Sequence, residues 1–210
     1  MMDSRTRRPY TCWDGLEGKK QGQYYCSVGS ENAFGRKLID KHYQYCLYSG
    51  LTISGINAEV APSQWEYQIG PVEGIEAADQ LWLSRYILQR LGEEFNIYIN
   101  FEPKPLTGNW NGSGCHTNYS TLAMREGTGL TTGLDHISKA IEKLSLKHDE
   151  HMKLYGTGNE LRMTGEHETS RFDKFNSGIA NRGASVRIPR ETNNNKCGYF
   201  EDRRPSSNMD

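Results

Sequence analysis

The chain has 210 residues, with 25 Lys and Arg against 26 Asp and Glu, and a formal net charge of −1. This balance excludes an overall attraction to nucleic acid or to an anionic membrane, and no run of eighteen apolar residues offers a membrane-spanning helix. Five scattered cysteines without a Cys-x-x-Cys pair favour free thiols in a reducing compartment: Cys12, Cys26, Cys46, Cys115 and Cys197. We therefore predict a soluble cytoplasmic protein with a single core and small-molecule partners.

The first half of the chain alternates helical and β-type patterns. We predict a helix that begins after the capping residue Ser30 and ends at Gly50. The runs at 51–58 and 65–70 are typical of two strands joined by a proline-containing bend. Apolar residues at helical spacing predict a second helix at 76–95.

The second half begins with a short β-rich run at 97–101 and a segment rich in Pro, Gly and Asn at 103–114, which predicts an irregular loop. A strand is predicted at 115–120. The next amphipathic pattern predicts a third helix at 134–155. Beyond Gly156 we predict short strands and loops.

Three glutamates lie beside apolar or aromatic residues in strand-like segments: Glu59, Glu66 and Glu201. A carboxylate is costly to bury unless a cation or hydrogen bonds compensate, and a divalent metal ion is the simplest such cation. Mg²⁺ and Mn²⁺ prefer oxygen ligands, and His116 offers a nitrogen that Mn²⁺ also accepts. The alternative is that each glutamate faces solvent and that His116 is a packed or surface residue.

Arginines recur in the C-terminal third of the chain. The set comprises Arg162, Arg182, Arg187, Arg190, Arg203 and Arg204. Guanidinium groups bind phosphate or carboxylate through paired hydrogen bonds, and a site that transfers a phosphoryl group needs their charge. The alternative is a solvated basic edge, above all for Arg190 and Arg204, because neighbouring residues of a strand point to opposite faces.

The loop GNWNGSGCH contains glycines that let backbone amides approach a ligand closely. The sequence has no P-loop, no Rossmann glycine motif and no His-Glu-x-x-His motif, so those classes of site are excluded. His148 and His151 lie three residues apart on a predicted helix and offer a metal-binding pair. Their charged neighbours favour surface positions instead.

Five blocks of sequence resemble, in order and spacing, the catalytic domain of eukaryotic-type glutamine synthetases. The blocks are NAEVAPSQWEYQIGP, KPLTGNWNGSGCHTNYST, RMTGEHETS, ANRGASVRIPR and GYFEDRRPSSN. The resemblance covers residues 23–210, whereas residues 1–22 form an unmatched N-terminal segment. It implies an α+β fold with a curved, mainly antiparallel sheet and helices packed on its outside.

The resemblance also implies a reaction, the ATP-dependent ligation of ammonia to L-glutamate, which gives L-glutamine through γ-glutamyl phosphate with Mg²⁺ or Mn²⁺ bound. Glu59 and Glu66 correspond to ligands of one metal ion, and His116 and Glu201 to ligands of a second. Glu168 corresponds to the carboxylate of a flap that closes over the site and helps to take a proton from ammonium. Such closure excludes water, which would hydrolyse the acyl phosphate.

Further residues correspond to substrate and nucleotide contacts in the family. The counterparts of the glutamate-binding residues are Asn109, Trp110, Asn111, Gly112, Arg162, Arg182 and Arg203. Arg182 and Arg187 correspond to catalytic residues that reach the nucleotide phosphates and the transferring group. The counterparts of the nucleotide-binding surface are Glu66, Tyr67, Gln68, Ile69, Gly70, Pro71, Asn118, Tyr119, Ser120, Tyr199, Phe200 and Glu201.

Two features of the family are missing from this sequence: a small N-terminal domain, and a strand whose Glu-x-Glu pair supplies one ligand to each metal ion. The terminal helices of the family are missing too, so we interpret the chain as truncated at both ends. We expect the complete protein to form a homo-oligomeric double ring. An inactive relative that binds nucleotide or subunits without turnover is an alternative function. Another ATP-dependent carboxylate-amine ligase or a guanidino kinase is a further one, although the loop GNWNGSGCH favours glutamate.

Overall fold

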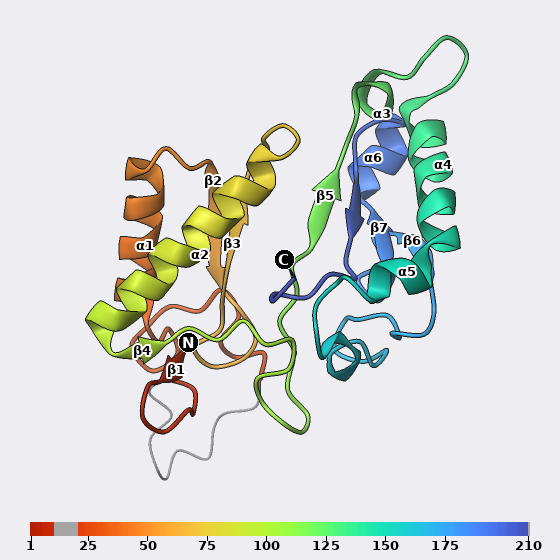
Figure 1. The fold of residues 1–210 in the computed structure, drawn as a ribbon. Helices are drawn as coiled ribbons and strands as arrows, with labels where there is room; N and C mark the ends of the chain where they lie inside the picture. The colour runs from red at the N-terminus through yellow and green to blue at the C-terminus, as the bar shows by residue number, and fades with distance from the viewer. Residues whose placement is uncertain (11–20, 210) are drawn as a thin grey trace. The chain divides into compact units, whose positions relative to one another are not determined.

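The computed structural model describes residues 1–10 and 21–209 and divides the chain into two compact units, Met1–Asn100 and Phe101–Asp210 (Figure 1). The sequence predicted one core, and the difference arises because each half packs its own helices on its own strands. Predictions that concern residues 11–20 and 210, including the free thiol of Cys12, lie outside the described residues. The other four cysteines are free, as predicted.

In the first unit, two helices pack on an antiparallel hairpin. The hairpin strands β2 (Ile53–Ala58) and β3 (Trp65–Ile69) confirm the two predicted strands. Helices α1 (Arg36–Tyr48) and α2 (Glu76–Phe95) contact each other and the hairpin. A second antiparallel pair, β1 (Met2–Asp3) with β4 (Ile97–Tyr98), lies beside α2. The run predicted at 97–101 is therefore a strand only at its start.

Helix α1 begins at Arg36 rather than directly after Ser30. Its N-cap is Gly35, whose φ of 78° is left-handed and therefore favours glycine. The preceding residues form turns, in which the N–H of Ala33 donates to the carbonyl of Gly29 at 2.9 Å. The predicted end near Gly50 is confirmed, since the helix stops at Tyr48.

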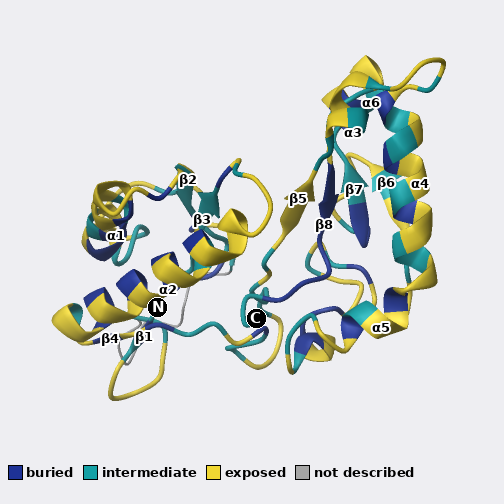
Figure 2. Cartoon of the chain, turned by 45° about the horizontal axis from the view of Figure 1, so that its top comes forward, coloured by how far each residue is buried: buried dark blue, intermediate teal, exposed yellow. Residues whose placement is uncertain are grey.

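Helix α2 has the predicted bounds, and its C-cap Asn96 has a left-handed φ of 55°, which stops the helix after Phe95. Its buried residues include Ser84, Leu88 and Leu91, which recur at helical spacing. In Figure 2, α2 is coloured as buried in patches along one side and as exposed along the other. Burial of this apolar stripe holds α2 against its unit.

The second unit contains a four-stranded sheet in the order β5-β8-β7-β6. Its strands are β5 (Thr117–Tyr119), β6 (Ser177–Ile179), β7 (Val186–Ile188) and β8 (Phe200–Asp202). Strands β6 and β7 are parallel, whereas the other two pairs are antiparallel. The chain is therefore an α+β protein with mainly antiparallel sheets and helices packed against them, as predicted.

The helices of the second unit are shorter than the sequence predicted. They are α3 (Leu122–Glu126), α4 (Gly133–Leu146), α5 (His148–Met152), α6 (Arg190–Asn195) and the 3₁₀ turn η1 (Asn159–Leu161). The helix predicted at 134–155 is divided at Lys147, whose φ of −109° and ψ of 14° are not helical. Helices α3 and α6 were not predicted. With five and six residues, they are too short to show the spacing of apolar residues that identifies a helix.

Helix α4 begins with a capping box. The hydroxyl of Thr132 accepts from the N–H of Asp135 at 3.3 Å, and the Asp135 carboxylate accepts from the N–H of Thr132 at 2.7 Å. Both bonds satisfy N–H groups that the first turn of a helix leaves without partners. The cap fixes where α4 starts.

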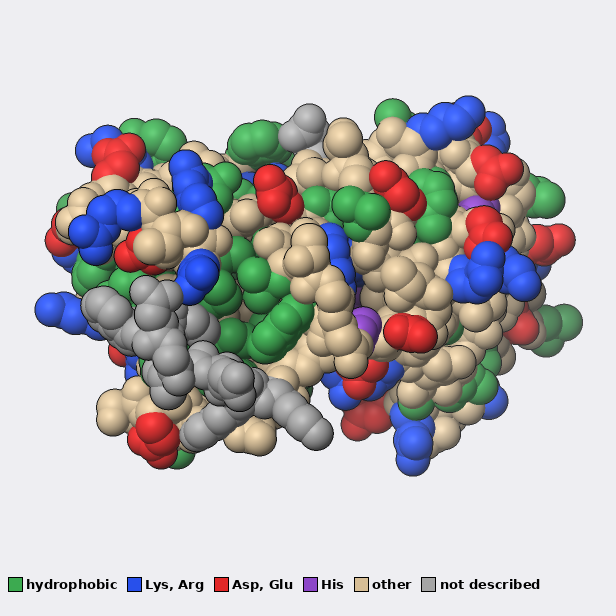
Figure 3. Space-filling view, turned by 90° about the horizontal axis from the view of Figure 1, so that it is seen from below, with side chains coloured by type: hydrophobic (Ala, Val, Ile, Leu, Met, Phe, Trp, Pro, Cys, Tyr) green, Lys and Arg blue, Asp and Glu red, His purple; other side chains and the backbone are tan. Residues whose placement is uncertain are grey.

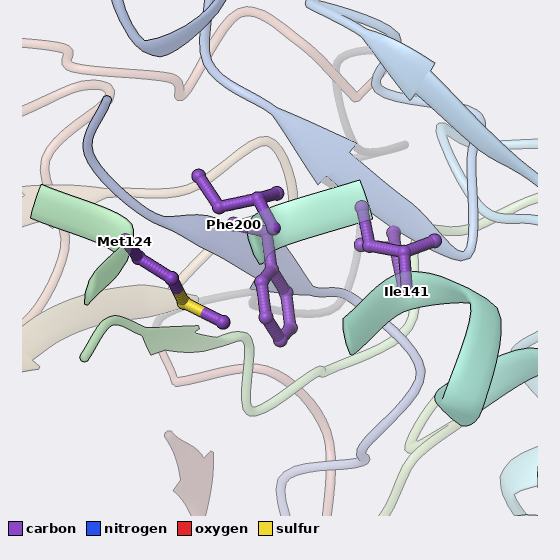
Figure 4. Packing of buried hydrophobic residues seen from close by; sticks show 5 residues of the cluster. Met124, Ile141 and Phe200 are labelled. Carbon is purple, nitrogen blue, oxygen red and sulfur yellow. The ribbon is translucent and has the colours of Figure 1, made fainter. Parts of the chain in front are cut away.

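The core of the second unit joins α3 and α4 to one face of the sheet. Its buried members are Met124, Ile137, Ile141, Val186 and Phe200. Figure 4 shows the side chains of Met124 and Ile141 on either side of the Phe200 ring. Burying each such side chain contributes about 1.5–3 kcal/mol. Phe200 thereby anchors β8 to the helices.

The surface mixes charges of both signs. Over the face seen in Figure 3, Lys and Arg side chains are interspersed with Asp and Glu, without a large patch of one sign. In the part of the chain that the structure describes, no helix combines the length and apolar composition needed to cross a bilayer.

Candidate active site

The first unit brings Glu59 and Glu66 together beside the turn of the β2–β3 hairpin. Glu66 lies opposite Asn57 in the register, and Glu59 follows two residues after Asn57, with its N–H bonded to the carbonyl of Gln64 at 2.9 Å. Side chains two residues apart share a face of a strand. The two carboxylates are therefore diagonal neighbours on one face of the hairpin. That they share a cation stays a prediction.

The charges of this pair are poorly compensated by the protein. Gln68 Nε2 donates to Glu66 Oε1 at 2.7 Å, and the N–H of Val60 donates to Glu59 Oε2 at 3.1 Å. Burial, together with the hydrogen bond to Glu66 and its charge, raises the pKa of Glu59 to about 7. A divalent cation would relieve this repulsion, so the pair fits a metal ion chemically.

In the second unit, the strand register places polar side chains in a row across one face of the sheet. Asn118 on β5 and Arg187 on β7 both lie opposite Glu201 on β8. The carboxylate of Glu201 is buried between two guanidinium groups, with Arg187 Nε at 2.5 Å and Arg203 Nη1 at 3.1 Å. His116 Nδ1 lies 3.4 Å from Glu201 Oε1. The structure therefore brings Arg187, Arg203 and His116 around one carboxylate.

The electrostatics keep Glu201 ionised. Burial alone would raise its pKa, but the hydrogen bond and charge of His116 and the charges of Arg203 and Arg187 lower it to about 2. The contribution of His116 applies in acid, where its imidazole is protonated, and at neutral pH the two arginines keep Glu201 ionised. Burial lowers the pKa of His116, although Glu201 opposes that shift. The imidazole is thus neutral at neutral pH, and a neutral nitrogen is the form that binds a metal ion.

One oxygen of Glu201 is poorly satisfied. Its Oε2 and Arg187 Nε form an ion pair by distance, yet neither buried atom makes a hydrogen bond of acceptable angle. A buried carboxylate oxygen without an aligned donor has a lone pair for a cation. The oxygen of Glu201 and the nitrogen of His116 therefore fit the donor preference of Mn²⁺ and, through the oxygen, of Mg²⁺.

Each of these two groups contains two of the predicted metal ligands. Within residues 1–10 and 21–209, no three His, Cys, Asp or Glu side chains come together as a metal-binding group. Glu59 and Glu66 belong to the first unit, and His116 and Glu201 belong to the second. The gathering of all four around one cleft stays a prediction.

Arg162 is buried beneath the loop at 109–114. Its Nη2 donates to the carbonyl of Arg204 at 2.7 Å, and burial lowers its pKa to about 10, so it remains charged. The loop passes so close that a Cβ on Gly112 would lie 2.4 Å from Arg162 Cγ, and one on Gly114 would lie 2.9 Å from Arg162 Nη1. Gly112 and Gly114 therefore let the backbone of the loop approach the side chain of Arg162 closely.

The other predicted residues of that loop differ in exposure. Asn109 is exposed, whereas Trp110 and Asn111 are half-buried. Lys104 Nζ donates to the carbonyl of Trp110, and the left-handed φ of 84° at Gly108 allows the turn. Lys104 was not predicted as part of the site, because a lysine in a polar loop gives no signal of the carbonyl that it will hold.

The predicted flap residue Glu168 pairs with Arg182, whose Nη2 lies 2.7 Å from Glu168 Oε2. Arg203 donates to the backbone carbonyls of Glu168 at 3.2 Å and of Arg182 at 3.1 Å. His167 and Glu168 have left-handed φ values of 51° and 59°, which are costly for residues other than glycine. Backbone strain is therefore concentrated where the flap acid is expected.

The predicted nucleotide residues on β3 divide between its two faces. Glu66 and Gln68 share the face of the carboxylate pair, as predicted. Tyr67 turns toward the helices, where its hydroxyl lies 3.0 Å from Ser84 Oγ, and Ile69 shares its face. Gly70 and Pro71, the last two residues predicted for this surface, follow the strand and are joined by a cis peptide bond.

The nucleotide residues predicted on β5 and β8 divide in the same way. Asn118 shares the face of Glu201 in the register, and Ser120 and Tyr199 follow by alternation. Tyr119 and Phe200 lie on the opposite face, with ring centroids 5.6 Å apart. Ser120 Oγ donates to the carbonyl of Gly198 at 2.7 Å, which ties the end of β5 to the start of β8.

Two predictions of surface exposure are wrong. Arg204 is fully buried and forms a double hydrogen bond with Asp202, with Nε to Oδ1 at 2.9 Å and Nη2 to Oδ2 at 2.7 Å. Tyr155 also donates to Asp202 Oδ2 at 2.9 Å. His148 is buried beside Arg204, with Nδ1 at 3.2 Å from Arg204 Nη1 and Nε2 at 2.9 Å from the carbonyl of Phe172.

The physical reason is that the face opposite the site is a core rather than a solvated edge. Arg204 points away from Arg203, as strand alternation requires, but Asp202 shares its face and neutralises it. Arg190 is exposed, as predicted. His151 is half-buried, with Nδ1 3.4 Å from Arg204 Nη2.

The fold is shared with solved structures of other proteins. A solved structure of GmaS in complex with ADP, conformation 1, shares the fold with a TM-score of 0.64 and 22% identity over 92% of this chain and 45% of that chain. The structure of GmaS without ligand gives a TM-score of 0.66, with 22% identity over 92% of this chain and 44% of that one. At this level of identity the likeness shows the fold.

The sequence comparisons are more specific. The family described as glutamine synthetase, catalytic domain, matches residues 3–145. A putative glutamine synthetase of Acanthamoeba polyphaga mimivirus is 59% identical over 197 residues, which cover 93% of this chain and 55% of the relative. The glutamine synthetase of Yarrowia lipolytica is 59% identical over 190 residues, 90% of this chain and 51% of the relative. A cytosolic isozyme of Pinus sylvestris is 58% identical over 190 residues, 90% of this chain and 52% of the relative.

The chain therefore belongs to the glutamine synthetase family. It spans about half the length of the curated relatives that it matches.

Proposed function

We propose that this chain provides the main frame of a site that joins ammonia to L-glutamate with ATP and gives L-glutamine through γ-glutamyl phosphate. The observation that carries the proposal is the buried carboxylate of Glu201, held among Arg187, Arg203 and His116 on one face of the sheet. Membership of the glutamine synthetase family supports the same chemistry. We assign this function to residues 23–210, which contain the five sequence blocks.

Two metal sites follow from the two clusters. Glu59 and Glu66 would hold one divalent cation, and His116 and Glu201 would hold a second. When bound, Mg²⁺ or Mn²⁺ supplies positive charge that stabilises the oxygens of a transferring phosphoryl group. This arrangement requires the four side chains to converge in the working protein.

Different arginines bind the two substrates, ATP and glutamate. Arg187 and Arg182 bind the nucleotide phosphates, because guanidinium groups stabilise charge on phosphoryl oxygens. Arg203 and the buried Arg162 position the carboxylates of glutamate, together with Asn109, Trp110, Asn111 and Gly112 in the loop above Arg162. The ATP surface consists of residues 66–71, 118–120 and 199–201.

Glu168 acts last. Its carboxylate is about half exposed and pairs with Arg182, so this pair must open before Arg182 reaches a phosphate. Glu168 then takes a proton from ammonium, and the loop that carries it excludes water from the acyl phosphate. The cytosolic isozyme of Pinus sylvestris supports a cytoplasmic location, and we propose a homo-oligomeric double ring for the complete protein.

The test is formation of γ-glutamyl hydroxamate from glutamate, ATP and hydroxylamine with Mg²⁺ or Mn²⁺, on this chain and on a form extended upstream. We expect Glu201→Gln to lower the rate at least about 100-fold, because it removes a metal ligand and the partner of two arginines. The exposed Glu191→Gln is the matched control and should leave the rate unchanged. No hydroxamate from either form would defeat the proposal, and turnover with a different amine alone would indicate another ligase.

A further inference from the structure

Asn159 is a fully buried polar residue at the start of the 3₁₀ turn η1, and the sequence predicted no role for it. We propose that Asn159 is a positioning residue of the glutamate site. Its amide orients the guanidinium of Arg162 and leaves the positive charge of Arg162 for a carboxylate of the substrate. The inference rests on the proposed function, in which Arg162 binds glutamate.

The side chain of Asn159 joins Arg162 to the segment that follows β8. Its Oδ1 accepts a hydrogen bond from Arg162 Nε at 3.0 Å, and its Nδ2 donates to the carbonyl of Arg204 at 2.8 Å. Residues three apart lie above each other in a 3₁₀ turn, so η1 brings the side chains of Asn159 and Arg162 to one side. Both ends of the amide are bonded, and its orientation is therefore fixed.

The backbone holds a second nitrogen of the same guanidinium. Arg162 Nη2 donates to the carbonyls of Arg204 at 2.7 Å and Pro205 at 3.2 Å. Because the guanidinium is planar, fixing Nε and Nη2 also fixes the direction of Nη1. Nη1 lies against the loop at 109–114, where a Cβ on Gly114 would be 2.9 Å away. The bond from Asn159 thus helps to direct Arg162 toward the loop that is proposed to bind glutamate.

The groups that hold Arg162 are neutral. Among residues 1–10 and 21–209, no carboxylate forms an ion pair with it. Burial lowers the pKa of Arg162, and the positive charge of Arg203 lowers it further. A buried cation without a counter-ion is costly, and the carboxylate of a ligand would supply the missing charge.

Arg204 shows the opposite arrangement in the same unit. Its Nε donates to Asp202 Oδ1 at 2.9 Å and its Nη2 donates to Asp202 Oδ2 at 2.7 Å, so a carboxylate neutralises it. Where Arg204 has an acid, Arg162 has the amide of Asn159. An amide oxygen orients a guanidinium through a hydrogen bond without cancelling its charge. Asn159 therefore prepares Arg162 for an anionic ligand, whereas the pair of Arg204 and Asp202 is structural.

The orientation is tested without turnover, by exchange of the Arg162 Nε proton with water in ¹H–¹⁵N spectra of the complete chain. Arg162→Lys identifies this resonance by its disappearance. Asn159→Leu has a side chain of similar size without either hydrogen bond, and it should speed the exchange at least about tenfold. Asn159→Asp keeps an acceptor for Nε, so its exchange should stay slow. Exchange that is unaltered in Asn159→Leu would overturn the proposal.

The charge is tested by KM values in the form of the protein that makes γ-glutamyl hydroxamate. Asn159→Asp should raise KM for L-glutamate about tenfold and leave KM for ATP unchanged, because its carboxylate competes with that of the substrate for Arg162. This variant also decides the matter if Asn159→Leu does not fold. The matched control is Asn194→Asp, which gives the same change of charge at an exposed residue of α6 and should alter neither constant.

An unchanged KM for L-glutamate in Asn159→Asp would overturn the proposal. An equal rise in both constants would overturn it too, since it would show general damage to the fold. If no form makes hydroxamate, the proposed function fails and takes the role in glutamate binding with it. The exchange of the Arg162 proton would still decide whether Asn159 orients Arg162, so the two failures are distinguishable.

Discussion

Replacing Arg204 by Met should strongly destabilise the second unit. Arg204 is fully buried, and its Nε and Nη2 hold both oxygens of Asp202 at 2.9 and 2.7 Å. The substitution leaves a buried carboxylate that still accepts hydrogen bonds from the Tyr155 hydroxyl and from the backbone N–H of residue 204. Removing one partner of a buried ion pair costs about 3–5 kcal/mol. This is a large part of the usual 5–15 kcal/mol of domain stability, so urea unfolding followed by circular dichroism should show it clearly.

The double variant Asp202→Leu with Arg204→Met distinguishes a lost ion pair from general damage to packing. It leaves no unpaired charge in the core, so we expect it to be more stable than Arg204→Met alone. The control Arg190→Met changes an exposed arginine and should shift the free energy of unfolding by less than about 0.5 kcal/mol. The reasoning is refuted if Arg204→Met costs less than about 1 kcal/mol, or if the double variant shows the plain sum of the two single losses.

Three further results are expected. Thr132→Ala removes the cap of α4 and should lower the free energy of unfolding by about 1 kcal/mol in urea, whereas a loss near zero would mean that the capping box is not formed in solution. Burial lowers the pKa of His42 in the folded chain. As the pH falls, His42 is therefore protonated in the unfolded chain at a higher pH than in the folded chain. The unfolding free energy should therefore fall as pH drops below about 6.5, and the difference between the unaltered chain and His42→Gln should be constant above that value. Burial also raises the pKa of Cys46 to about 11, so iodoacetamide at pH 8 should alkylate the exposed Cys26 and spare Cys46, as mass spectrometry of the digested protein will show.

Long elements with a clear period were predictable from the sequence. Helix α2 appears at 76–95 because its apolar residues repeat over five turns, and β2 and β3 appear because β-branched and aromatic residues alternate around a bend. The break at Lys147 and the late start of α1 at Arg36 were not predictable in this way. Both depend on the backbone conformation of single residues, which the spacing of apolar residues does not reveal.

The candidate site was predictable in its residue types but not in its contacts. The pairing of Glu59 with Glu66 follows from one hairpin, and a local pattern therefore suffices. The environment of Glu201 depends on the register of β5, β7 and β8, which come from distant parts of the chain. The same long-range packing decides that Arg204 faces a core with Asp202 and His148 rather than water.

The alternation along residues 200–204 makes the length of this stretch more critical than the identity of most of its residues. The side chains of Phe200, Asp202 and Arg204 pack in the interior, whereas those of Glu201 and Arg203 lie on the opposite face. A single residue inserted or deleted within β8 would move every residue on one side of the change to the opposite face of the sheet. It would separate the buried pair of Asp202 and Arg204 from its neighbours or take Phe200 out of the core. We expect variants of this protein to tolerate conservative changes here far better than any change in spacing.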